Sequence, residues 1–468
     1  MFKNNYFLNF NNNLVALNDS GEKLSYGELN GLISKLKIII NERCLVFCFC
    51  SNTLGSLVGY TSFISNRIVP LLLDSSLDLK FINNLFNIYK PSYVWLPSKD
   101  VHKFSHFQNI LVINDYVLLK TNFQYSYPLF DQLALLLTTS GSTGSPKLVR
   151  LSYENLESNT VSIIKYLGID DNERPITILP MNYSYGLSII NIHLYKGATI
   201  LFTEKSILEK EFWNFLKAER ATSISGVPYT FEILQKLKFS NMKLPSLRTL
   251  TQAGGKLNLD TIKYFSQYSQ NENKSFYLMY GQTEASPRIS YLPPLSLEKK
   301  IGSIGIPIPG GELYLISETN TKIDKVGESG ELVYKGKNVT LGYSNNGDDL
   351  ALGDINNGIL YTGDIAYFDN DNYFYITGRK NRDIKVFGNR INLDHIEELF
   401  KSIIGECACI GKDNKILIFI IDQKKELELQ DFILNKLFFN KNTFCIKILS
   451  EIPKNTFGKI IYSNLELN

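Results

Sequence analysis

The sequence predicts an α/β protein with a large N-terminal body, a β-rich segment that closes it, and a small, mobile C-terminal α+β domain. Three observations support this prediction: the length of the chain, an alternation of apolar runs with helical patterns, and a change of pattern after about Ile301. At 468 residues, the chain exceeds the size at which one hydrophobic core keeps growing. More than one packed unit is therefore expected.

Short apolar runs alternate with longer helical patterns through the first three-quarters of the chain. Runs such as ILVIND, PITILP and ATILFT stand beside helical segments such as SILEKEFWNFLKAER. This alternation predicts parallel strands joined by crossover helices. After about Ile301 the segments GELYLI, GELVYKG and YFYITG follow one another closely, which predicts the β-rich closing segment.

The last part of the chain changes pattern again. From Asn381 onward we expect a strand pair, a helix, two apolar strands, another helix and a last strand. No Pro-rich or Gly/Ser-rich linker precedes them, so a short hinge rather than a flexible tether is expected. The predicted boundaries are a large domain over 1–378, a hinge over 379–383 and a small domain over 384–468.

Composition excludes several classes of protein. The chain is 44% hydrophobic and 20% charged, as globular proteins are. Its net charge of +3 and lack of a long basic run argue against a nucleic-acid partner. No run approaches the roughly 20 apolar residues of a membrane span, and the segment MFKNNYFLNFNNN has no signal-like apolar stretch. We expect a cytoplasmic protein.

The cysteines carry no sign of a metal site. All six (Cys44, Cys48, Cys50, Cys407, Cys409 and Cys445) lie in apolar runs without zinc-site spacing. We expect small buried side chains in a reducing compartment.

A loop rich in Ser, Thr and Gly is the strongest chemical signal. It follows the apolar run LLL, ends at a lysine, and leads into a polar segment that begins a helix. Glycines let backbone N–H groups approach a phosphate, hydroxyls donate hydrogen bonds, and the lysine adds positive charge. The pattern is not a Walker A loop, and a plain surface loop is the alternative. The candidate phosphate-binding residues are Thr139, Ser140, Gly141, Ser142, Thr143, Gly144 and Lys147.

Further motifs follow this loop in a specific order. They are T-S-G-S-T-G-x-P-K, then TQAGGKL, YGQTEAS, IGSIGIPIPG, GELVYKG, YTGD, GRKNRDIKVFGNRI and PKNTFGK. From about PLLLD to the end, the chain resembles the adenylate-forming enzymes: acyl- and aryl-CoA ligases, peptide-synthetase adenylation domains and firefly luciferases. The resemblance implies an enzyme that uses ATP and Mg²⁺ to convert a carboxylic acid into an acyl-AMP with release of pyrophosphate. The acyl group then passes to a thiol, either of CoA or of phosphopantetheine on a separate carrier protein.

The resemblance also implies residues that contact the nucleotide. Thr283 holds the α-phosphate, and Glu284 helps to bind Mg²⁺, which prefers oxygen ligands. Asp364 accepts the ribose hydroxyls, although an Asx turn would explain it equally well without the resemblance. Arg379 binds ribose or phosphate, with a surface ion pair as its alternative. The remaining implied nucleotide-binding residues are Gly254, Gly255, Tyr280 and Gly281.

Two lysines are implied to act in different steps. Lys459 bridges the acid carboxylate and the α-phosphate during attack, where a cation stabilises the transition state more than the ground state. The small domain then rotates about a hinge at Asn381, where the family usually has Asp or Lys. After rotation Lys385 faces the site. The substrate carboxylate is itself the nucleophile, so no Ser-His-Asp arrangement is required.

The segment LPMNYSYGLSII resembles the substrate side of the family. Tyr183 and Tyr185 are candidate pocket residues, with simple packing as the alternative. Family members that activate amino acids commonly carry an aspartate here, so its absence disfavours an α-amino acid. The sequence does not identify the small carboxylic acid.

Two other functions remain open at this stage. One is a loader of a separate acyl carrier protein: the chain from Arg379 onward has 15 Lys and Arg against 12 Asp and Glu, which suits an acidic carrier or the phosphates of CoA. The other is a nucleotide-binding regulator without ligase activity, which the loss of Lys459, Glu284 or Asp364 would have favoured. All three residues are present.

Overall fold

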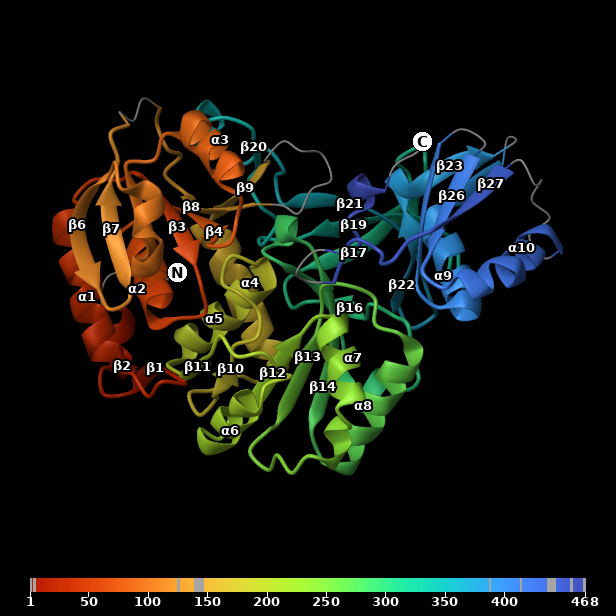
Figure 1. Ribbon diagram of the computed structural model, residues 1–468, viewed down its shortest axis with the longest axis horizontal. Helices are drawn as coiled ribbons and strands as arrows, with labels where there is room; N and C mark the ends of the chain where they lie inside the picture. Colours follow the sequence, from red (N-terminus) through yellow and green to blue (C-terminus); the bar gives the residue numbers. More distant parts are fainter. Residues whose placement is uncertain are drawn as a thin grey trace.

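The computed structural model describes residues 2, 6–123, 127–138, 147–386, 389–412, 415–435, 443–454 and 458–465. A large body is followed by a smaller C-terminal unit, drawn in blue in Figure 1. This arrangement confirms the predicted α/β body with a small C-terminal α+β domain.

One large sheet takes most of its strands from the middle of the chain. Its central strands pair in parallel, as the alternation of apolar runs and helices predicted. The strands lie in the order β16 (Ile306–Pro307), β15 (Arg288–Leu292), β14 (Ser275–Gly281), β13 (Thr249–Gln252), β12 (Ser223–Gly226), β10 (Pro175–Ile176), β11 (Ile200–Phe202), β1 (Leu14–Asn18) and β2 (Lys23–Ser25).

A second sheet is formed mainly by the N-terminal part. Its order is β20 (Gly342–Ser344), β9 (Leu148–Ser152), β8 (Leu133–Thr138), β4 (Val69–Asp74), β3 (Leu45–Cys50), β5 (Tyr93–Pro97), β7 (Tyr116–Lys120) and β6 (Gln108–Ile113). Every residue of β3 is buried. A strand covered on both faces is apolar throughout, which explains the run LVFCFC.

Helices cover both faces of these sheets. The helices α1 (Tyr26–Ile39), α2 (Leu54–Ser65), α4 (Tyr153–Leu167) and α5 (Ser184–Lys196) contribute to one core that contains residues from both sheets. The helix α3 (Leu79–Tyr89) packs on the other face of the second sheet. The helices α6 (Lys210–Ala218), α7 (Pro228–Lys236) and α8 (Leu259–Asn271) pack on the other face of the first, as Figure 1 shows.

An antiparallel sheet closes the body, as predicted from the closely spaced strands after Ile301. Its order is β18 (Lys322–Ile323), β17 (Glu312–Ile316), β19 (Gly330–Lys335), β21 (Ile359–Phe368) and β22 (Phe374–Arg379). The short helix η7 (Lys380–Arg382) follows β22 directly.

The C-terminal unit has the expected order of elements and its own apolar core. They are β23 (Asp383–Val386), β24 (Asn389–Asn392), α9 (Leu393–Ile404), β25 (Cys407–Lys412), β26 (Lys415–Ile420), α10 (Glu426–Asn435) and β27 (Phe444–Ile448). Helix α9 contacts β22, so the unit lies against the closing sheet.

Three expectations were wrong. The run ILVIND forms β6, which pairs antiparallel with β7 at the edge of its sheet instead of in parallel. The segment after Lys147 does not lead directly into a helix: it first forms β9, antiparallel to β8, and Ser152 then caps α4. Cys445 is exposed, whereas the other cysteines are buried as expected.

We also searched the described ranges for transmembrane helices. None of their helices combines the length and the apolar character that crossing a bilayer requires.

Candidate functional site

The carboxyl ends of three parallel strands bring separate motifs together. After β12 the chain enters α7, after β13 it forms the glycine pair, and after β14 it forms η4 (Thr283–Ala285). Because these strands are parallel neighbours, their carboxyl ends lie at one edge of the sheet, where α/β proteins bind ligands. Segments far apart in the sequence therefore share one site.

Asp364 lies at the centre of a buried hydrogen-bond network. Its Oδ2 accepts hydrogen bonds from Tyr280 Oη and, at 3.2 Å, from Gln282 Nε2. Its Oδ1 lies 3.3 Å from Arg379 Nε, and the two residues are direct partners in the β21–β22 pairing. Burial raises the pKa of Asp364, while the hydrogen bond from Tyr280 and the charge of Arg379 oppose that rise.

Glu284 connects η4 to the lysine that follows the Ser/Thr/Gly loop. Its Oε1 accepts a hydrogen bond of 2.7 Å from Tyr343 Oη. The Nζ atom of Lys147 lies 5.4 Å from the centre of the same tyrosine ring, within the range of a cation–π contact. Lys147 and Glu284 thus contact the same side chain, Lys147 through the ring and Glu284 through the hydroxyl.

The C-terminal unit places Lys459 near these acids. Its side chain remains accessible to solvent, yet the surrounding protein and the positive charge of Arg379 lower its pKa below the ordinary 10.5. The negative charges of Glu284 and Asp364 act in the opposite direction. The preceding Gly458 has a φ of +75°, and a Cβ there would lie 3.1 Å from Tyr229 on α7. The loop that carries Lys459 is therefore in contact with the body.

Two glycines are required by geometry. Gly254 has a φ of +89°, and a Cβ there would lie 2.6 Å from Tyr183 Oη. A Cβ at Gly281 would lie 1.8 Å from the carbonyl oxygen of Pro287, where the β14–β15 register shifts. Larger residues would disrupt both turns. Gly255 lies beside Pro228, the first residue of α7.

The two candidate pocket tyrosines lie near η4. The rings of Tyr183 and Tyr185 are 6.3 Å apart, and Tyr185 Oη donates a 2.9 Å hydrogen bond to the carbonyl of Thr251. Ser184, between them, is hydrogen-bonded to Thr283 at 3.1 Å. The amino end of α5 is therefore adjacent to the Y-G-x-T-E element.

Several predicted residues cannot be placed in this network. Thr139, Ser140, Gly141, Ser142, Thr143 and Gly144 lie outside the described residues. Asn381 lies in η7 and Lys385 in β23, but their side chains lie outside the described part.

Sequence reasoning missed Gln282 and Tyr343. Gln282 stands inside YGQTEAS and could have been suspected from its place beside Thr283. Tyr343 belongs to no motif that we recognised. Only the pairing of β20 with β9 brings it next to Lys147.

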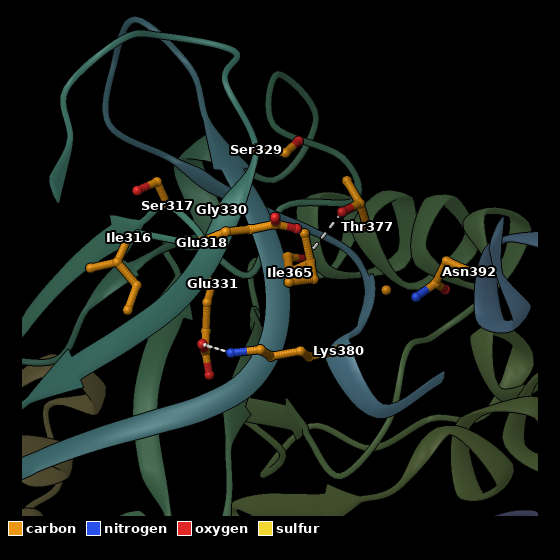
Figure 2. A pocket seen from close by; sticks show the side chains of 11 residues that line it. Ile316, Ser317, Glu318, Ser329, Gly330, Glu331, Ile365, Thr377, Lys380 and Asn392 are labelled. Carbon is orange, nitrogen blue, oxygen red and sulfur yellow. Dashed lines mark hydrogen bonds and ion pairs between the residues drawn. The ribbon is translucent and has the colours of Figure 1, made fainter. Parts of the chain in front are cut away.

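A pocket of about 300 Å³ lies near η7 (Figure 2). Lys380 points toward Glu331 there and forms an ion pair of 2.7 Å. Ile365 lines this pocket, whereas Asp364, one position earlier on β21, joins the network described above. Successive strand residues point to opposite faces, so the pocket lies on the other face of the closing sheet from Asp364.

The acidic residues do not form a metal cage. Across the described ranges, no group of three or more His, Cys, Asp or Glu side chains is arranged to hold a metal ion. Mg²⁺ usually binds through one or two carboxylates together with phosphates and water. A single partly buried carboxylate, Glu284, beside the lysine of a phosphate-type loop fits that pattern.

Comparison with known proteins identifies the family. The family model described as AMP-binding enzyme matches residues 101–344, more than half of the chain. The chain is 29% identical over 346 residues to 2-succinylbenzoate–CoA ligase of Oceanobacillus iheyensis, covering 72% of this chain and 70% of that protein. It is 30% identical over 289 residues to feruloyl-CoA synthase of an Amycolatopsis species, covering 60% and 57%.

Solved structures share the fold. The o-succinylbenzoate CoA synthetase of Bacillus subtilis, in complex with its acyl-adenylate intermediate, has a TM-score of 0.79 at 20% identity, with 99% and 98% of the two chains covered. ATP-bound MatB of Rhodopseudomonas palustris has a TM-score of 0.78 at 21% identity, with 98% of each chain covered. Because the family model matches more than half of its length, the chain belongs to the AMP-binding enzyme family.

Proposed function

We propose that this protein is an AMP-forming acid–CoA ligase. It activates a small carboxylic acid with ATP and transfers the acyl group to the thiol of CoA. One observation carries the proposal: Glu284, Asp364, Arg379 and Lys459 come from distant parts of the chain, yet their charges act on one another in one site. Surface turns placed independently would not produce this convergence.

The residues at the site suit the ribose and phosphates of ATP. A carboxylate has about four acceptor positions, so Asp364 can accept ribose hydroxyls while it keeps its bonds from Tyr280 and Gln282. Arg379 balances its charge. Thr283 and Lys147 provide a hydroxyl and a cation for phosphate oxygens. By the family resemblance, the glycine pair Gly254 and Gly255 packs beside the adenine ring.

Magnesium, when bound, neutralises phosphate charge. Glu284 is the residue of this chain that would hold it, together with the phosphates. The hydrogen bond from Tyr343 orients the Glu284 carboxylate. Lys147, whose Nζ lies 5.4 Å from the centre of that ring, attracts the pyrophosphate that leaves.

The first half-reaction follows from this arrangement. The acid carboxylate attacks the α-phosphorus, a new P–O bond forms, and the bond to pyrophosphate breaks. Lys459 donates hydrogen bonds to the carboxylate and the α-phosphate as charge develops between them. Its place beside Glu284 and Asp364 supports this role.

The second half-reaction requires Lys459 to withdraw. We propose that residues 1–378 and 384–468 move as two domains about a hinge at 379–383, centred on Asn381, and that Lys385 then enters the site. The short helix η7 between β22 and β23 supports a hinge at this place. Relatives whose names specify CoA favour CoA over a carrier protein as acceptor.

A direct test measures ATP–pyrophosphate exchange with aryl, fatty, hydroxy and dicarboxylic acids. Each active acid is then offered CoA or a phosphopantetheinylated carrier protein. We expect acid-dependent exchange and acyl-CoA formation, and no exchange with Lys459→Ala. ATP binding without exchange for any acid would contradict the ligase and favour a nucleotide-binding regulator. Acyl transfer to the carrier alone would reassign the acceptor.

A further inference from the structure

Arg288 is a buried cation at the start of β15. Only 1% of its surface is exposed, and among the residues that the structure describes no carboxylate forms an ion pair with it. A buried charge without a partner is strongly destabilising, so such residues are rare unless they serve a purpose. The contacts around Arg288 must therefore explain why a charged side chain is buried at this position.

Tyrosines from two helices surround the guanidinium. It lies 4.1 Å above the ring of Tyr185, and Nη2 approaches Ser188 Oγ at 3.5 Å, the limit of a hydrogen bond. Nε has no hydrogen-bond partner within the described part of the chain. Burial raises the pKa values of Tyr166 and Tyr183, while the charge of Arg288 opposes both rises, and a side-chain hydrogen bond with Arg288 also lowers the pKa of Tyr166. The donor that these contacts leave unused is Nε.

Another buried arginine of the same chain shows what a structural role requires. Arg150 is also fully buried, but its Nε, Nη1 and Nη2 all donate hydrogen bonds to backbone carbonyls, including those of Tyr343, Leu352 and Leu341. These bonds tie β9 to its neighbours. Arg288 has no comparable set of backbone acceptors: its guanidinium contacts the hydroxyls of Ser188 and Tyr166, and its Nε has no acceptor within the described residues, so Nε remains available for a ligand.

Arg288 lies next to the residues of the proposed reacting centre. It pairs with Gly281 in the β14–β15 register, so it stands beside the Y-G-x-T-E element. The Tyr185 that it covers follows Ser184, which is hydrogen-bonded to Thr283. Tyr183, whose pKa its charge affects, reaches the glycine pair at Gly254. An acid held at Thr283 would extend toward the tyrosines and the guanidinium.

We propose that Arg288 binds a second carboxylate on the acid substrate, so the enzyme activates dicarboxylic acids at the carboxylate far from the arginine. This inference rests on the proposed ligase function and names its substrate class. A guanidinium and a carboxylate match in geometry and form paired, charge-assisted hydrogen bonds. The tyrosine rings around Arg288 hold the carbon skeleton between the two carboxylates.

The test compares matched acids that differ only in the second carboxylate. Suitable pairs are succinate and butyrate, glutarate and pentanoate, and phthalate and benzoate. Wild-type protein should prefer a diacid by at least about 100-fold in kcat/KM, because a monoacid leaves the buried guanidinium unpaired. Arg288→Met should abolish this preference, mainly by raising KM for the diacid. Arg288→Lys should keep part of it.

A matched variant separates substrate binding from folding. Arg150→Met removes the other buried arginine and should lower the melting temperature without changing the diacid-to-monoacid ratio. If Arg288→Met does not fold, Arg288→Lys and the thermal shift of wild-type protein by each acid with a non-hydrolysable ATP analogue provide the same comparison. Stabilisation by diacids but not monoacids is expected.

The outcomes distinguish the two proposals. Wild-type activity that is equal for both members of every pair, or an equal loss with both in Arg288→Met or Arg288→Lys, would overturn the role of Arg288 and leave the ligase intact. Absence of exchange with every acid, despite ATP binding, would instead reject the ligase itself.

Discussion

Tyr343 Oη donates a hydrogen bond of 2.7 Å to Glu284 Oε1, and the same tyrosine ring lies 5.4 Å from Lys147 Nζ. One aromatic side chain thus contacts both the lysine of the Ser/Thr/Gly loop and the carboxylate of the Y-G-x-T-E element. The two contacts use different parts of the ring and can be removed separately.

Tyr343→Phe should keep the ring beside Lys147 and remove only the donor to Glu284. A hydrogen bond to a charged group contributes about 1.5–3 kcal/mol, so we expect a loss of at least about 10-fold in kcat/KM for ATP at limiting Mg²⁺. Tyr343→Leu should lose more, because it also removes the contact with Lys147. Initial rates over a Mg²⁺ titration measure both effects. Wild-type Mg²⁺ dependence in Tyr343→Phe would show that the hydrogen bond does not orient Glu284.

Lys459→Ala and Lys385→Ala should affect opposite half-reactions. Lys459→Ala should abolish ATP–pyrophosphate exchange while ATP still binds, because the lysine acts on the reacting centre. Lys385→Ala should spare exchange and slow thioester formation from preformed acyl-AMP. Each variant is the control for the other. Equal losses in both half-reactions would argue against a small domain that moves between two positions.

The decrease of the adenylation rate at high pH should report the pKa of Lys459. Only the protonated amine can bridge two anions, so the rate should fall as pH rises, with a midpoint below the ordinary 10.5 because the surrounding protein and the charge of Arg379 lower the pKa of Lys459. Arg379→Gln removes a positive neighbour and should move the midpoint to higher pH. Glu284→Gln removes a negative neighbour and should move it lower. Midpoints that move in the same direction in both variants would contradict this assignment.

An ion pair joins the body to the C-terminal unit. Lys256 Nζ, next to the glycine pair, lies 2.5 Å from Glu398 Oε1 on α9. Exposed pairs contribute up to about 1 kcal/mol, so Lys256→Glu should lower the adenylation rate, relative to the thioester step, by up to about 5-fold at low salt. The swap Lys256→Glu/Glu398→Lys should restore it, and high salt should remove the difference. A swap that remains as slow as the single variant would show that the pair does not hold the unit in place.

His193 should make the fold sensitive to acid. It is fully buried, its Nδ1 donates to the carbonyl of Ile189 at 2.7 Å, and burial lowers its pKa from 6.5 to about 4. As the pH falls, His193 therefore binds a proton in the unfolded chain before it does so in the folded one. The free energy of unfolding should then fall by roughly 3 kcal/mol between pH 6.5 and 4. Urea unfolding of wild type and His193→Leu measures the difference, since the other groups titrate in both. Parallel curves over this range would show that His193 does not contribute.

Much of the site could be predicted because its residues belong to local motifs. The glycines of TQAGGKL and YGQTEAS are required by the backbone turn or close approach at their own positions, so their role is visible in the sequence. The alternation of apolar runs and helices determined the α/β body for a similar reason: a central strand such as β3 is buried on both faces and is therefore apolar throughout.

Only the tertiary structure decided which distant residues meet. Tyr343 reaches Lys147 because β20 pairs with β9, and Arg288 faces Tyr185 because β15 returns alongside β14 next to α5. The exposure of Cys445 was likewise outside the reach of local patterns. The antiparallel pairing of ILVIND is different, because β6 pairs with β7, the next strand in the sequence, directly across Asn114 and Asp115. Turn chemistry and apolar periodicity act over a few residues, whereas strand pairing and burial depend on contacts between segments that the sequence keeps far apart.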